Sequence, residues 1–175
     1  RFGTKGFRKL TYIDYTNVVK RLKSLQFRHL QQEDFLRISS EYVDPKTGVT
    51  KMSNIRTEVS GVGNISKYCK SDNIVDTNGG VFGTFEQKTL IRNDDDSLVY
   101  PVDFEDFNFR VSLQVENKYN QGTGIIRGII DKWSTNKKTF RLINRTTLIH
   151  DKFPLKVDLS IVRSSRKINR NYVPE

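Results

Sequence analysis

The chain has 175 residues, with 30 Lys and Arg against 20 Asp and Glu, and its formal net charge is +10. This length suits one domain with a sizeable core and is too short for two ordinary ones, so residues 1–175 are expected to form a single domain. No apolar run approaches the roughly 18 residues that span a bilayer, and a single cysteine excludes an internal disulfide and a cysteine-rich zinc site. The charge excess favours a polyanionic partner, although solvated surface cations give the same balance.

Two segments have the pattern of helices. Apolar side chains recur at helical spacing behind Asp14, which predicts an amphipathic helix over 15–26 with Asp14 as its N-cap. A shorter helix is predicted over 65–70, with Asn64 as its cap and Asp72 at its end. The basic face of the first helix is expected to be solvated.

The rest of the chain has the pattern of β-strands. The segment FLRISSEYV meets the turn DPKTG at 44–48 and returns through 49–61, which is typical of a β-hairpin. Further strand candidates, separated by loops rich in Asn, Asp and Gly, are VFGTFEQKTLIR, FNFRVSLQVE, TGIIRGII, KTFRLINRTTLI and LKVDLSIVR. Seven or more strands with few helices and no βαβ rhythm favour an antiparallel barrel or sandwich over a doubly wound sheet.

Charged side chains share one face of several of these strands, because side chains alternate across a strand. The charged residues that this alternation groups are Arg56, Glu58, Glu86, Lys88, Arg110, Glu116, Arg141, Arg145, Lys156 and Asp158. On an open sheet, such a face is simply the side that meets water. In a closed barrel, the same faces would line a polar lumen, whose crowded cations need carboxylates, a metal or an anionic ligand. A triphosphate is such a ligand, because its negatively charged oxygens accept hydrogen bonds from the guanidinium of Arg and the ammonium of Lys.

Four segments carry a resemblance to a known family. In order, SNIRTEVSGVGNISKYCKSD, FRVSLQVE, KTFRLINR and LKVDLSIVRSS resemble the RNA triphosphatase domains of giant-virus capping enzymes, which belong to the triphosphate tunnel metalloenzymes. The resemblance covers nearly the whole chain and implies a mainly β (α+β) fold, an antiparallel closed β-barrel tunnel of about eight strands with a few flanking helices. It implies hydrolysis of the γ-phosphate from the 5′-triphosphate end of nascent mRNA, the first step of cap formation.

The resemblance also implies a role for individual residues. Those that match the catalytic strand positions of the family are Arg110, Arg141, Arg145, Lys156 and Asp158. The four cations among them would bind phosphate, as would Arg56 and Lys88, which are expected to face the same lumen. Asp158 would hold a neighbouring cation or a metal-bound water in place. Ile143 stands where the family commonly has the lysine of Arg-x-Lys-x-Arg, so one phosphate contact is lost.

The metal motifs of the family are the main departure. Its members bind Mg²⁺ or Mn²⁺ with two Glu-x-Glu pairs, on the first and last strands, and neither pair is present in residues 1–175. We expect that the chain is a segment of a longer capping enzyme, cut just inside both motifs; a degenerate, inactive relative is the alternative. Glu58, Glu86 and Glu116 could assist a metal or orient water, but none is expected to be a ligand, so the metal ligands stay unknown.

Partners and setting follow from the same resemblance. It implies 5′-triphosphate RNA as substrate and a guanylyltransferase domain in the same polypeptide. The lack of a long apolar run predicts no membrane partner. The lone Cys69 favours an intracellular setting, which for a viral protein is the cytoplasm of the infected host cell or the virion. Two other functions fit these residues: a tunnel-fold polyphosphate or nucleotide phosphohydrolase, and a non-catalytic basic RNA-binding domain.

Overall fold

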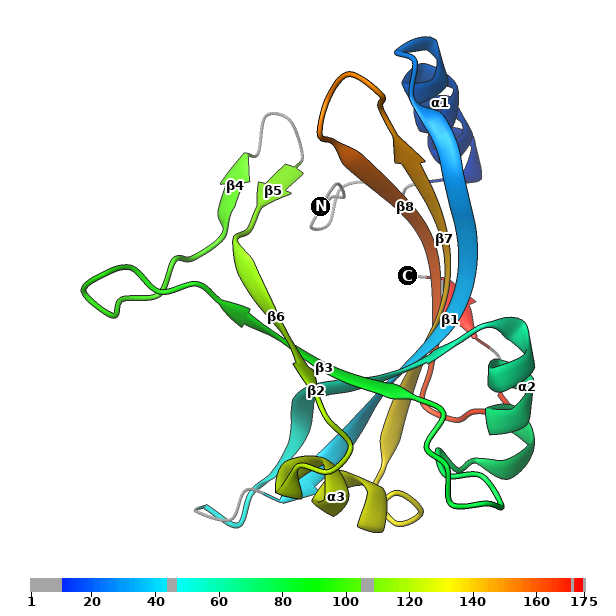
Figure 1. The fold of residues 1–175 in the computed structure, drawn as a ribbon, viewed down its shortest axis with the longest axis vertical. Coiled ribbons are helices and arrows are strands. Elements are labelled where there is room, and N and C mark those ends of the chain that lie inside the picture. The colour runs from blue at the N-terminus through cyan, green and yellow to red at the C-terminus, as the bar shows by residue number, and fades with distance from the viewer. Residues whose placement is uncertain (1–10, 44–46, 105–108, 171, 175) are drawn as a thin grey trace. The chain divides into compact units, whose positions relative to one another are not determined.

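The structure is a computed structural model that describes residues 11–43, 47–104, 109–170 and 172–174. The described residues form a mainly β fold with three helices (Figure 1). In chain order the elements are α1 (Tyr12–Ser24), β1 (Arg28–Val43), β2 (Thr50–Ser60), α2 (Val62–Ser71), β3 (Thr84–Leu90), β4 (Val102–Phe104), β5 (Phe109–Val111), β6 (Gln114–Tyr119), α3 (Gly124–Asp131), β7 (Lys138–Ile149), β8 (Lys156–Ser165) and β9 (Val173–Pro174).

Seven strands form one antiparallel sheet in the order β6-β3-β2-β1-β7-β8-β9, and β4 pairs with β5 separately. Among the described strands this sheet has two edges, β6 and β9, and no pairing joins them. The closed barrel that the resemblance implies is therefore not formed by the described strands. The chain divides into two compact units: unit 1 is Arg1–Leu30, Lys88–Glu116 and Thr147–Leu159, and unit 2 is Gln31–Gln87, Asn117–Thr146 and Ser160–Glu175.

The core of unit 2 lies on one face of its strands. Leu36 and Ile38 of β1 and Val59 of β2 are fully buried and cluster with Tyr68 of α2. A second cluster joins β2 and β3 to Ile126 of α3. Helices α2 and α3 therefore cover the same face of the sheet, as Figure 1 shows. Removal of these apolar side chains from water is the main force that holds the unit together.

The β1–β2 hairpin that the sequence predicts is confirmed, with Phe35 opposite Ser60 and Val43 opposite Thr50. Its predicted turn falls partly on residues 44–46, which lie outside the described residues. A register shift between Ser39 and Glu41 marks a β-bulge in β1. Because β1 and β2 pair antiparallel, alternate side chains of both strands share a face, and the hairpin alone sorts apolar from charged residues.

The two predicted helices are present, with corrected starts. Thr11, and not Asp14, is the N-cap of α1: its side chain accepts a hydrogen bond from the Asp14 backbone N–H, and its own backbone N–H donates one to the Asp14 carboxylate. This reciprocal capping box places Asp14 inside the first turn. Helix α2 begins after Gly61 and not after Asn64. Its predicted end is confirmed, because Asp72 takes a left-handed conformation there, with φ of 48°.

Two strand predictions are wrong. The segment TGIIRGII forms α3, because its isoleucine pairs recur four residues apart and so fit a helix, with Ile126, Ile129 and Ile130 packed inward. The segment FNFRVSLQVE does not form one strand. It is divided at 112–113 into β5 and β6, and its predicted apolar side chains Val111 and Leu113 are exposed.

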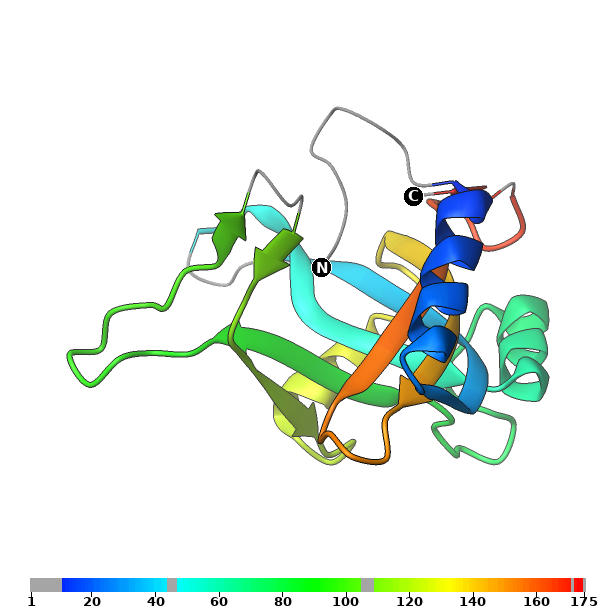
Figure 2. The same ribbon diagram turned by 90° about the horizontal axis from the view of Figure 1, so that it is seen from above.

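Unit 1 contains α1 and the hairpin of β4 and β5, whose strands lie side by side in Figures 1 and 2. His150 packs between the rings of Phe27 and Phe153, with centroid distances of 5.1 and 4.7 Å. None of the helices within the described residues is both long and apolar enough to cross a bilayer.

Candidate functional site: the charged face of the sheet

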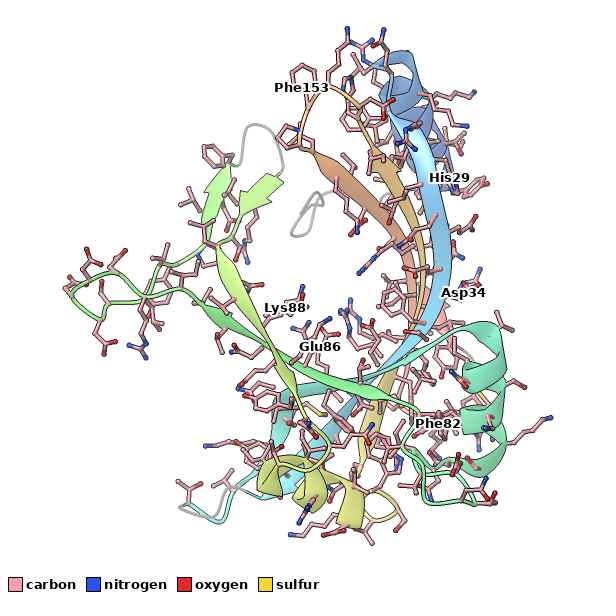
Figure 3. The ribbon with its side chains drawn as sticks, viewed as in Figure 1. His29, Asp34, Phe82, Glu86, Lys88 and Phe153 are labelled. Carbon is pink, nitrogen blue, oxygen red and sulfur yellow. The ribbon has the colours of Figure 1, made fainter. Side chains whose placement is uncertain are left out.

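The charged residues of unit 2 gather on the face of the sheet opposite its core. In register, Ser39 of β1 faces Arg56 of β2, which in turn faces Glu86 of β3. One step along the ladder, Arg37 faces Glu58. Paired residues of an antiparallel sheet lie on the same side, so these residues form one surface. We call it the charged face; Figure 3 labels Glu86 on it and Asp34 on the opposite side.

The charged face is largely shielded from water. Glu86 is only 9% exposed, and the side chains of Arg37 and Glu58 are 12% and 17% exposed. Arg37 donates a hydrogen bond to Glu58 over 3.0 Å, so each charge compensates the other. The polar side of an ordinary open sheet is exposed, and this one is not. Unit 2 therefore has a partly shielded polar surface, although its described strands form an open sheet and not the closed barrel of the sequence interpretation.

Phe35 of β1 contacts arginines from two strands of this surface, Arg37 of β1 and Arg145 of β7. Its buried ring lies under two guanidinium groups, that of Arg145 at 4.7 Å and that of Arg37 at 5.6 Å from the centroid. Arg145 of β7 also donates from Nε to Ser160 Oγ of β8 over 3.4 Å. These contacts place Arg145 and Ser160 on the face of Phe35. A ring beneath two guanidinium groups fixes their planes and partly balances their charge.

The remaining predicted cations of unit 2 follow from strand alternation. Arg141 and Ile143 have the parity of Arg145 along β7, and Arg141 is half-buried. Ile143 is buried, with 3% exposure. The isoleucine thus occupies the middle of a row of arginines, where a lysine ammonium would need a carboxylate or an anion beside it.

Unit 1 holds the other predicted site residues. Lys88 pairs with Glu116 over 3.3 Å, and both side chains are partly exposed. Asp158 accepts a hydrogen bond of 2.7 Å from Thr147, which is buried, so the carboxylate is fixed in direction. Lys156, two residues earlier on β8, is exposed. The positioning role expected of Asp158 stays a prediction.

Arg110 differs from its predicted setting. It lies on β5, paired in register with Asp103 of β4, and makes a bidentate ion pair with that carboxylate. The hydrogen bonds and the charge of Asp103 raise the pKa of Arg110. The sequence predicted that Arg110 and Glu116 share one strand. This is wrong, because Arg110 lies on β5 of the two-stranded pair and Glu116 lies on β6. The break at 112–113 is the physical reason.

Two residues of the charged face escaped the sequence analysis, namely Phe35 and Arg37. Both lie in FLRISSEYV, which was interpreted as one arm of a hairpin without sorting its side chains by parity. Alternation alone would have separated Phe35, Arg37 and Ser39 from Leu36 and Ile38. Their contacts with residues of β2 and β7 could not be predicted in the same way.

The fold of this chain is similar to that of a known protein. The solved structure of the Mimivirus capping enzyme triphosphatase is similar, with a TM-score of 0.54 and 11% sequence identity. The similarity covers 95% of this chain and 75% of the Mimivirus chain. No family model matches the chain, and no curated protein does. The fold therefore resembles that of a viral capping-enzyme triphosphatase.

The described side chains do not form a site for a divalent metal ion. Within residues 11–43, 47–104, 109–170 and 172–174, no three His, Cys, Asp or Glu side chains gather closely enough to hold an ion. Glu58 is committed to Arg37, and Glu116 to Lys88. Mg²⁺ and Mn²⁺ take several carboxylate oxygens, so the described residues do not fit the expected cofactor.

Proposed function

We propose that the chain is the triphosphate-binding part of an RNA 5′-triphosphatase, which hydrolyses the γ-phosphate from the 5′-triphosphate end of nascent mRNA. The observation that carries this proposal is the charged face, where the guanidinium groups of Arg37 and Arg145 lie over the ring of Phe35 and the Arg37 side chain is largely shielded from water. Shielded cations are costly unless an anion offsets them, and they bind phosphate more strongly than exposed cations do. The likeness in fold to the Mimivirus enzyme supports the same activity.

Within unit 2, we assign the phosphate oxygens to Arg56, Arg141 and Arg145. The fork of a guanidinium donates two parallel hydrogen bonds to a phosphate, and a fixed fork loses little entropy on binding. Arg145 is held by Phe35 and Ser160 before any ligand arrives. Phosphoryl transfer depends mainly on positioning and on neutralising charge in the transition state, which is work that fixed arginines perform.

The other predicted residues belong to the same proposal. Lys88, Arg110 and Lys156 are proposed to contact phosphate, and Asp158 to position a neighbouring group. An RNA substrate, a guanylyltransferase domain in the same polypeptide, and Mg²⁺ or Mn²⁺ with ligands outside the described residues also belong to the proposal. None of them is needed for the first test, which is whether the chain binds a triphosphate.

The test compares three ligands on the full chain. Calorimetry measures the affinity for inorganic tripolyphosphate, for RNA with a 5′-triphosphate and for the same RNA with a 5′-hydroxyl. Phosphate release is then followed with Mg²⁺, with Mn²⁺ and with neither ion. Tighter binding of 5′-triphosphate RNA than of 5′-hydroxyl RNA supports the proposal. Release from tripolyphosphate alone favours a polyphosphate phosphohydrolase. Equal binding of both RNAs without hydrolysis favours a non-catalytic RNA-binding domain.

A further inference from the structure

Unit 2 has a second positively charged feature, a pocket of about 370 Å³ on the opposite side of β7 from Arg145. Phe140, which belongs to the core cluster, lines this pocket, whereas Arg145 lies on the charged face. The pocket is lined by one carboxylate and four cations, namely Asp72, Lys138, Arg166, Lys167 and Arg170. Four cations against one carboxylate leave a net charge of +3, so the pocket attracts anions.

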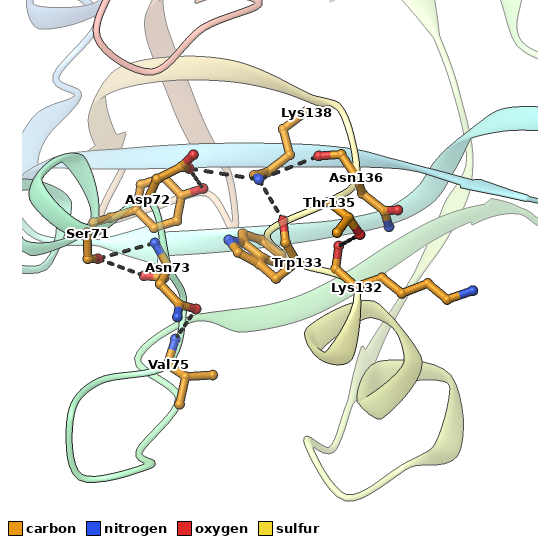
Figure 4. A network of polar contacts seen from close by, with 10 residues as sticks. Ser71, Asp72, Asn73, Val75, Lys132, Trp133, Thr135, Asn136 and Lys138 are labelled. Carbon is orange, nitrogen blue, oxygen red and sulfur yellow. Dashed lines mark hydrogen bonds and ion pairs between the residues drawn. The ribbon is translucent and has the colours of Figure 1, made fainter.

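Lys138, one of the residues that line the pocket, is held in a network of polar contacts (Figure 4). Its ammonium donates to the Trp133 carbonyl over 2.6 Å and lies 3.9 Å from Asp72 Oδ1. Asp72 also accepts from Tyr68 Oη over 2.8 Å. The Lys138 side chain is 6% exposed, and burial lowers its pKa. These contacts tie the ends of α2 and α3 together and occupy both Lys138 and Asp72.

The cations left to bind a ligand lie on the segment after β8. Arg166, Lys167 and Arg170 are exposed and line the pocket from one side. The backbone carries them on two tight turns: Lys167 N donates to Ser165 Oγ over 3.2 Å, and Arg170 N donates to the Lys167 carbonyl over 3.3 Å. Asn136 and Ser134 on the other side add polar groups that accept and donate hydrogen bonds. This combination suits phosphate oxygens.

We propose that Arg166, Lys167 and Arg170 bind backbone phosphates of single-stranded RNA, outside the site for the triphosphate end. This inference rests on the proposed function, because it assumes that the substrate is RNA and not a free polyphosphate. The pocket lies on the core side of β7, and the charged face lies on the other side. In this proposal, one RNA chain contacts both surfaces of unit 2. The pocket then contributes affinity for the RNA chain, independent of sequence.

The test uses an RNA that cannot occupy the triphosphate site. A single-stranded RNA of about 15 nucleotides with a 5′-hydroxyl reports only on backbone binding. The variant Arg166→Gln/Lys167→Gln/Arg170→Gln is expected to lower its affinity about tenfold and to reduce the slope of log affinity against log salt by about 2. A matched variant, Lys20→Gln/Arg21→Gln/Lys23→Gln on α1, removes the same charge and should change the affinity less than twofold. Inorganic tripolyphosphate should bind both variants as it binds the wild type.

Each other outcome is decisive. Equal losses in both triple variants would mean that only net charge matters, and an unchanged salt slope in the pocket variant would remove these residues from RNA binding. Loss of tripolyphosphate binding without loss of RNA binding would assign the pocket to a free phosphate compound. The proposed function is tested separately, because it fails if the wild type does not bind tripolyphosphate or 5′-triphosphate RNA. Circular dichroism of each variant checks that the fold is kept.

Discussion

Arg37 and Glu58 form the ion pair on which the charged face depends. Their side chains meet at 3.0 Å in directly opposed positions of β1 and β2, and both are largely buried. The Arg37 Nε has no hydrogen-bond partner among the described residues, so Glu58 supplies the contact that compensates this guanidinium. A buried charge that loses its partner keeps its desolvation cost, whereas an exposed one regains water.

We therefore expect Glu58→Gln to lower the free energy of unfolding by about 2–4 kcal/mol. Glu116→Gln is the control, because its pair with Lys88 is partly exposed and should contribute less than about 1 kcal/mol. Urea unfolding of both variants at neutral pH measures the difference. Equal small losses would show that water reaches the Arg37–Glu58 pair.

Arg145 should be required for triphosphate binding, and Arg163 should not. Both arginines come from neighbouring strands of unit 2, but Arg163 is exposed and has the opposite parity to Ser160 on β8. Arg145→Ala should weaken the binding of tripolyphosphate at least about tenfold, because a charge-assisted contact contributes roughly 1.5–3 kcal/mol. Arg163→Ala should leave it within about twofold. Calorimetry measures both, and equal affinities would exclude Arg145 from the site.

Ile143 is the residue at which stability and phosphate binding should oppose each other. Ile143→Lys introduces the lysine of the Arg-x-Lys-x-Arg pattern that the resembled family commonly has. It also buries an ammonium, so we expect a loss of about 2–4 kcal/mol in the free energy of unfolding without ligand. Tripolyphosphate should recover part of this loss by binding only the folded state. Ile143→Met keeps the volume and should cost under about 1.5 kcal/mol with no such recovery. An Ile143→Lys variant that tripolyphosphate fails to stabilise would contradict a phosphate site beside this residue.

Tyr172 should make the stability fall at alkaline pH. Burial, and secondarily the charge of Cys69, raises the pKa of Tyr172 to about 12. The ordinary value is about 10, so between pH 10 and 12 the unfolded chain loses a proton that the folded chain retains. Its stabilising contribution is complete below pH 10 and is lost as the pH rises through this window. Urea unfolding between pH 9 and 11.5 should show a smaller loss in Tyr172→Phe than in the wild type.

Tyr12→Phe is the control for that experiment, because Tyr12 is an exposed residue of α1. It should follow the wild type at every pH. Tyr68, whose pKa is raised by burial and by Asp72, stays in all three proteins and contributes the same alkaline loss to each. If Tyr172→Phe also follows the wild type, the hydroxyl titrates alike in the folded and unfolded chains.

Local patterns in the sequence predicted most of the elements and failed at two. Strand patterns predicted β1, β2, β7 and β8. Apolar side chains of β1, β2 and β7 pack in the core of unit 2. The isoleucines of α3 were interpreted as a strand although their pairs recur four residues apart, and the helix packs Ile126 against Ile55 and Phe85. Arg110 was assigned to a long strand because nothing local marks the break after Val111. Its bidentate pair with Asp103 depends on β4, a strand that the sequence did not indicate.

By itself, the sequence determined the excess of positive charge, the antiparallel β character and the grouping of cations and carboxylates on alternate positions of each strand. These properties follow from residue type and from the period of a strand, which need no knowledge of neighbours. Only the tertiary structure decided which strands are adjacent. That order brings Arg37 to Glu58 and sets Phe35 beneath Arg145, because such contacts join residues far apart in the chain. It also buries the charged side of the sheet, which alternation alone would have left exposed to water.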